Sequence, residues 1–161
     1  MIQPTPKAND RLASPGPLLF AFAVLIAGML PTMLMFALDP NVTTRISLDA
    51  VPIPGWVFTA VWLIAYPCMG IATWLVWRQR HRANVSVALA IFLLGFIQTL
   101  CFWFTTSVQM TAVLDAMVML AAYTVAFVYF QFDRRTVFWL LPWLIWMPIT
   151  FAVKLWVVFA A

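Results

Sequence analysis

Long apolar runs separated by short polar segments make up almost all of this chain. The runs cover residues 17–38, 55–77, 85–107, 108–132 and 136–160. A helix of about 20 residues crosses the hydrocarbon core of a bilayer, so each run is long enough to span one. The pattern therefore predicts an all-α fold, an integral membrane bundle of five transmembrane helices within residues 17–161. Residues 1–16 are polar and contain prolines, and we expect a mobile N-terminal tail there.

Composition supports this assignment and limits the kind of partner. Apolar residues make up 65% of the chain and charged residues 9%, whereas about a quarter of a soluble domain is charged. The lipid bilayer is therefore the expected partner. The net charge of +4 reflects basic loops and not a nucleic-acid-binding surface. No metal-ligand spacing occurs, so no metal site is expected, and Cys68 and Cys101 should be buried, reduced thiols.

Basic residues are concentrated on one side of the predicted bundle. With five spans, the tail, the second loop and the fourth loop share a side, which carries Lys7, Arg11, Arg78, Arg80, Arg82, Arg134 and Arg135. The loops of the other side carry only Arg45. In an inner membrane this bias predicts a cytoplasmic N-terminus. The first loop, residues 39–54, then lies on the far side; its length and three prolines make it a candidate lid.

The tryptophans occupy two kinds of position. Six lie near the ends of runs, as expected of an interfacial belt: Trp56, Trp74, Trp77, Trp103, Trp139 and Trp156. Trp62, Trp143 and Trp146 lie well inside their runs, where the indole N–H needs a partner other than water. Such rings can line a pocket for a flat molecule, although aromatic residues at helical spacing are more often ordinary packing.

Helical spacing also places polar residues on aromatic faces. The last run carries on one face Trp139, Trp143, Trp146, Thr150 and Lys154. One face of the second run carries Phe58, Trp62, Tyr66, Met69 and Thr73. One face of the third run carries Gln98, Cys101, Phe102 and Thr105.

Two charged residues fall inside spans, in the half of the membrane nearest the first loop. A charge at mid-membrane costs about 2.5–3.5 kcal/mol and usually faces the bundle interior. One interpretation is that Lys154 extends to the interface and Asp115 caps its helix. The other is that Asp115 and Lys154 pair and line a cavity under the first loop.

The chain resembles the TspO/MBR family, the tryptophan-rich sensory and translocator proteins, in two helices. The segment PGWVFTAVWLIAY at residues 54–66, followed by MGIA at 69–72, is similar to the family's second-helix signature. The segment LPWLIW at 141–146 resembles the family's Pro-Tyr-x-x-Trp motif, with Trp143 in place of tyrosine, and FQFD at 130–133 fits the end of its fourth helix. The resemblance covers about residues 17–156.

The resemblance implies a five-helix bundle, commonly a homodimer, with a ligand pocket beneath the first loop. The family binds porphyrins such as protoporphyrin IX and haem. For this chain we therefore expect no covalent cofactor, and a bound porphyrin or haem as ligand. Proposed family roles include tetrapyrrole transport, stress signalling and light-dependent porphyrin breakdown.

This chain departs from the family pattern at pocket positions. The family's Trp-x-Pro-Pro reads VPIP at residues 51–54, its Asn-x-x-Trp in the third helix reads Gln98-x-x-Cys101, and a late asparagine of its fifth helix falls at Lys154. The two missing tryptophans argue against tryptophan-dependent photochemistry. A positive charge near the pocket instead suits a ligand carboxylate.

These observations predict a membrane receptor or transporter that binds porphyrin- or haem-type tetrapyrroles. The alternatives are a light-dependent porphyrin-degrading enzyme, and a small transport or assembly partner with no tetrapyrrole role. The expected ligand-binding residues are Trp56, Trp62, Tyr66, Gln98, Phe102, Asp115, Trp143, Trp146, Thr150 and Lys154.

Overall fold

The computed structural model describes residues 15–45 and 50–160, and within them the chain is helical. Its elements are α1 (Gly16–Leu38), α2 (Val42–Arg45), α3 (Gly55–Trp77), α4 (Val85–Leu100), the short 3-10 helix η3 (Cys101–Phe104), α5 (Val108–Phe130) and α6 (Thr136–Ala160). Five helices in this part of the chain are long and apolar enough to cross a membrane, with α4 and η3 counted as one 20-residue span. The predicted all-α bundle of five transmembrane helices is confirmed. The predicted tail lies almost entirely outside the described residues.

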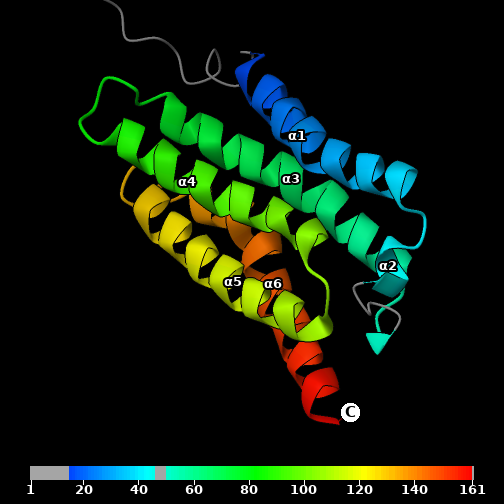
Figure 1. The fold of residues 1–161 in the computed structure, drawn as a ribbon. Helices are drawn as coiled ribbons and strands as arrows, with labels where there is room; N and C mark the ends of the chain where they lie inside the picture. Colours follow the sequence, from blue (N-terminus) through cyan, green and yellow to red (C-terminus); the bar gives the residue numbers. More distant parts are fainter. Residues whose placement is uncertain (1–14, 46–49, 161) are drawn as a thin grey trace, which may run out of the picture.

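Helix α3 holds the bundle together. It packs against α1 on one side and against α6 and α4 on others, while α5 packs against α4 and α6 (Figure 1). Helix α1 packs chiefly along α3, and most of its surface is left for lipid. It is therefore the transmembrane helix with the fewest attachments to the rest of the bundle.

Glycines bring α1 and α3 into close contact. A Cβ atom on Gly70 would collide with the backbone of Phe20, and one on Gly28 would collide with the ring of Tyr66. In lipid there is no hydrophobic driving force between apolar helices, so their association depends on close van der Waals packing, which small residues allow. Backbone contact at Gly70 thus fixes the position of α1 on α3.

A proline in α6 creates a bond between two helices. Pro148 has no N–H, so the carbonyl of Leu144, four residues earlier, lacks its partner within the helix. The Tyr123 hydroxyl of α5 donates to that carbonyl at 3.3 Å. A carbonyl freed inside a membrane needs such a partner, and the bond links α5 to α6 beside the buried core.

The third span ends differently from the prediction of one helix over residues 85–107. The α-helix stops at Leu100, η3 follows, and Thr105 is extended. The Thr105 hydroxyl donates to the Phe102 carbonyl at 2.7 Å, and the Ser107 hydroxyl accepts from the Met110 N–H at 3.2 Å as the N-cap of α5. Hydroxyl side chains compete for backbone groups and so favour a helix end over a helix interior.

Two smaller expectations are also corrected. Helix α5 ends at Phe130 and not at residue 132, because the chain turns before Thr136 begins α6. Cys101 is exposed and not buried, since it starts η3, where the helical face of α4 is no longer continued; Cys68 is half-buried.

The described parts of the first loop fold onto the bundle. Val42 of α2 is fully buried, and Val51 packs with Val108 of α5 and Val157 of α6. These contacts place the loop over one end of the helices, as Figure 1 shows for α2. The described parts of the loop therefore cover that end of the bundle.

Candidate ligand-binding cavity

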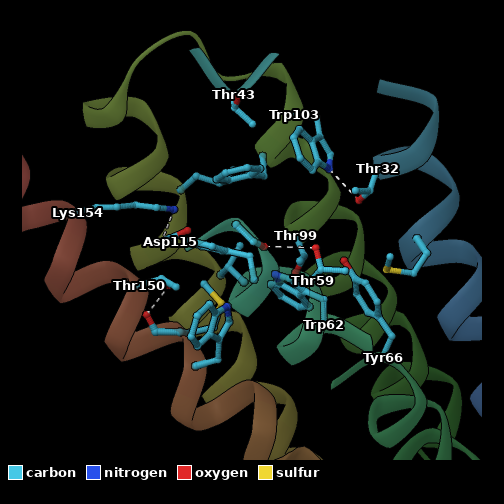
Figure 2. A pocket seen from close by; sticks show the side chains of 18 of the residues that line it. Thr32, Thr43, Thr59, Trp62, Tyr66, Thr99, Trp103, Asp115, Thr150 and Lys154 are labelled. Carbon is cyan, nitrogen blue, oxygen red and sulfur yellow. Dashed lines mark hydrogen bonds and ion pairs between the residues drawn. The ribbon is translucent and has the colours of Figure 1, made fainter. Parts of the chain in front are cut away.

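A cavity of about 150 Å³ lies between the helices beneath the first loop. Helices α3, α5 and α6, the end of α4 and η3 form its walls, and residues of α1 and Thr43 of α2 close it. Figure 2 shows the side chains that converge on it. Because Thr43 belongs to the first loop, the cavity lies beneath this loop, where the pocket was predicted.

Aromatic rings make up much of the wall. Trp62 and Tyr66, one turn apart on α3, stack with ring centroids 4.9 Å apart. Trp146 of α6 meets Phe58, one turn before Trp62 on α3, edge to face with ring centroids 5.2 Å apart. Offset and edge-to-face pairs are favourable aromatic geometries. They hold these rings in place as rigid apolar surfaces in the cavity wall.

An ion pair occupies another part of the wall. Lys154 Nζ of α6 lies 2.7 Å from Asp115 Oδ2 of α5, and both side chains are buried (Figure 2). The ammonium also lies over the Phe102 ring, 4.7 Å from its centroid. This geometry decides between the two interpretations of the sequence: Lys154 does not extend to the membrane surface, and Ser107, not Asp115, caps α5.

Hydroxyl groups complete the polar side of the cavity. The Trp103 indole N–H of η3 donates to Thr32 Oγ1 of α1 at 3.1 Å, and the Thr32 hydroxyl donates to the Gly28 carbonyl at 3.4 Å. The Phe36 ring packs edge to face on Trp103 with centroids 5.4 Å apart. Residues Thr32 and Phe36 thus attach α1 to η3 at the rim of the cavity.

The cavity has no grouping that resembles a metal centre. Among the described residues, no three His, Cys, Asp or Glu side chains lie together. Its chemistry comes instead from aromatic faces, hydroxyls and one ion pair, which suits an apolar molecule with a polar edge.

A family model described as the TspO/MBR family matches residues 20–159. The chain belongs to the TspO/MBR family. No curated protein and no solved structure matches the chain. Family membership supports a membrane role of the receptor or transporter type.

The cavity of this TspO/MBR protein contains seven of the ten residues predicted to bind ligand. These are Trp62, Tyr66, Phe102, Asp115, Trp146, Thr150 and Lys154. They come from α3, η3, α5 and α6, so the fold brings together residues that are up to 92 positions apart, from Trp62 to Lys154. Their role in binding stays a prediction.

Three predicted residues lie away from the cavity. Trp56 is 73% exposed at the start of α3, where it faces the surroundings of the bundle. Gln98 is half-buried on α4 but is not part of the wall. Trp143 is fully buried near Gly95 of α4, and its indole N–H has no hydrogen-bond partner. Three residues before Trp146, it is turned about 60° around α6 and so faces the core.

Sequence reasoning missed several wall residues. Trp103 was assigned to the interfacial belt because it lies near the end of a run, and Thr32, Phe36, Thr43 and Thr99 were not singled out. One signal was present: the hydroxyl residues at 105–107 predict a helix end. The tighter turn of η3 changes the direction of the side chains that follow Leu100.

Proposed function

We propose that this TspO/MBR protein is a membrane receptor or transporter that binds a flat, amphipathic tetrapyrrole in the cavity beneath the first loop. One observation carries the proposal: aromatic side chains from α3 and α6 line a cavity that also holds a buried ion pair. Ligand sites of this kind combine apolar walls with a few polar groups that fix orientation. Trp62, Tyr66 and Trp146 would contact the macrocycle, and Lys154 its polar edge.

The cavity has to widen for such a ligand. Its volume of about 150 Å³ is below the range of about 300–1,000 Å³ that is usual for ligand sites. Helix α1 provides the most movable wall because it packs chiefly along α3 and reaches η3 through the residues around Trp103. We expect ligand binding to displace α1 or the side chains that attach it to η3.

Equilibrium titration of the purified protein with protoporphyrin IX tests the proposal. Bound porphyrin should quench the tryptophan fluorescence of the cavity and give a saturable curve with one site per chain. A protein that shows no saturable quenching, with intact helicity, would disprove tetrapyrrole binding. The same titration with haem in place of protoporphyrin IX shows whether the site also binds a porphyrin with a central iron.

Illumination of the complex distinguishes binding from degradation. The light-dependent enzyme predicts loss of the porphyrin spectrum and a new product, whereas a receptor or transporter returns the porphyrin unchanged. Trp62, Trp103 and Trp146 line the cavity, so tryptophans are close to any molecule bound there.

The homodimer that the family resemblance implies is part of the proposal, and mass measurement in detergent tests it.

A further inference from the structure

The Asp115–Lys154 pair is unusual in its surroundings. Lys154 is 1% and Asp115 5% exposed, and no other charged side chain is buried among the residues whose side chains are described. Replacing a buried ion pair by apolar residues is often neutral or stabilising. A contribution to stability therefore does not explain why two charged residues are buried in the wall of the cavity.

The pair is directly available to a ligand. Both side chains line the cavity, and the lysine ammonium carries three N–H donors. One donor reaches Asp115 at 2.7 Å, and the ammonium rests on the face of the Phe102 ring. Figure 2 shows the Lys154 side chain extending from α6 toward Asp115, so the ammonium lies at the cavity wall and not at the membrane surface.

We infer that Asp115 and Lys154 form an exchangeable ion pair, which selects ligands with a carboxylate at one edge of a flat apolar body. The ligand carboxylate replaces the Asp115 carboxylate as the partner of Lys154. This inference rests on the proposed function and specifies the chemistry of the ligand edge. Its basis is the position of the pair: a cation held at the wall of an aromatic cavity by a single carboxylate.

The exchange gives the two residues opposite effects on acidic ligands. Lys154 attracts the ligand carboxylate, so its loss weakens binding. Asp115 competes for the same ammonium and repels the incoming negative charge, so its neutralisation strengthens binding. A purely structural pair would affect acidic and uncharged ligands alike, because both would sense the same damage to the cavity.

Protoporphyrin IX and its dimethyl ester make this difference measurable, since the ester keeps the macrocycle and removes the charges. Dissociation constants for both are measured by tryptophan quenching in nanodiscs. The proteins are the wild type, Lys154→Met, Lys154→Arg, Asp115→Asn, and the double variant Asp115→Asn/Lys154→Met. Arg80→Gln removes an exposed positive charge from the loop that follows α3 and serves as the control. Thermal unfolding of each protein shows whether it folds.

Lys154→Met should weaken acid binding about tenfold and leave ester binding within about twofold, as expected for loss of a charge-assisted hydrogen bond. Lys154→Arg should retain the preference for the acid. Asp115→Asn should strengthen acid binding over ester binding, and this gain should vanish in the double variant. The double variant leaves no unpaired charge, so it provides a folded protein even if a single variant is unstable.

The outcomes separate the inference from the proposed function. If acid and ester bind the wild type but their ratio is the same in every variant, the ion pair does not select the ligand and the inference fails alone. A weaker acid affinity in Asp115→Asn would also overturn it, because exchange requires the opposite sign. If neither porphyrin binds the folded wild type, the proposed function itself fails.

Discussion

Trp143 and Trp146 lie one turn apart on α6 but have different surroundings. Trp146 lines the cavity against Phe58, whereas Trp143 is fully buried near Gly95 and leaves its indole N–H unpaired. Both had been expected to touch a bound macrocycle. Their spacing of three residues instead places Trp146 in the cavity wall and Trp143 in the core.

Substitution by phenylalanine should separate these two roles. Trp146→Phe removes aromatic area from the cavity and should weaken porphyrin binding about three- to tenfold, since aromatic pairing contributes about 0.5–1.5 kcal/mol. Trp143→Phe should leave affinity within about twofold. It also removes an unpaired buried donor, which offsets part of the volume that is lost from the core.

Fluorescence titration of both variants measures the affinities, and thermal unfolding measures their stability. Equal weakening by the two substitutions would show that the porphyrin contacts Trp143 as well, and would place the ligand deeper in the bundle than the cavity. An unchanged affinity for Trp146→Phe would place it elsewhere.

At the scale of helices, the close contact at Gly70 determines how α1 docks. A side chain there meets the backbone of Phe20, which cannot move without shifting α1. Gly70→Ala should therefore destabilise the protein by about 1–3 kcal/mol, as overpacking does elsewhere. Gly55→Ala is the matched control, because no atom lies within 4 Å of its added Cβ. Thermal unfolding in detergent compares them; equal melting temperatures would mean that α1 does not depend on this contact.

The hydrogen bond between Thr32 and Trp103 should limit the rate at which the cavity opens to a ligand. Thr32→Val keeps the shape of the side chain and removes the acceptor for the indole N–H. Such a bond contributes about 0.5–1.5 kcal/mol, so porphyrin association and dissociation should both accelerate about two- to tenfold. Stopped-flow quenching measures both rates.

Thr124→Val is the control for this experiment, because the exposed Thr124 hydroxyl bonds only to the Leu120 carbonyl of its own helix in the contacts described. Rates that are unchanged in Thr32→Val would indicate that the ligand enters without separating α1 from η3. The same acceleration in both variants would point to a general loosening of the bundle.

At the scale of the whole molecule, the sequence predicted the architecture better than the walls of the cavity. The five apolar runs specify five spans because only helices of this length satisfy their backbone inside lipid. Helical spacing also correctly placed Trp62 beside Tyr66 and Lys154 on the face of Trp146. It did not separate Trp143, which faces the core, from Trp146 on the cavity wall. It also failed where the helix ends: the break after Leu100 depends on bonds made by Thr105 and Ser107, so the direction of Trp103 could not be read from α-helical spacing.

Orientation in the membrane also belongs to this scale. The loop after α3 and the turn before α6 lie at the same end, where the Gln79 side-chain amide donates to the Phe132 carbonyl at 2.8 Å. Both segments carry exposed arginines, among them Arg80 and Arg134. The predicted side for this end is the cytoplasm, because insertion retains basic loops there. Lys7 and Arg11, which contribute to the same bias, lie outside the described residues.

Accessibility of single cysteines tests this orientation. In a protein with Cys68 and Cys101 replaced by alanine, Arg80→Cys and Thr106→Cys place one thiol at each end of the bundle, both at exposed positions. A membrane-impermeant maleimide added to intact cells should label position 106 and spare position 80 until the membrane is permeabilised. Labelling of position 80 alone would reverse the orientation and would place the first loop, with the cavity beneath it, on the cytoplasmic side. The fold and the ion pair would be unaffected, since neither depends on which side of the membrane the loop occupies.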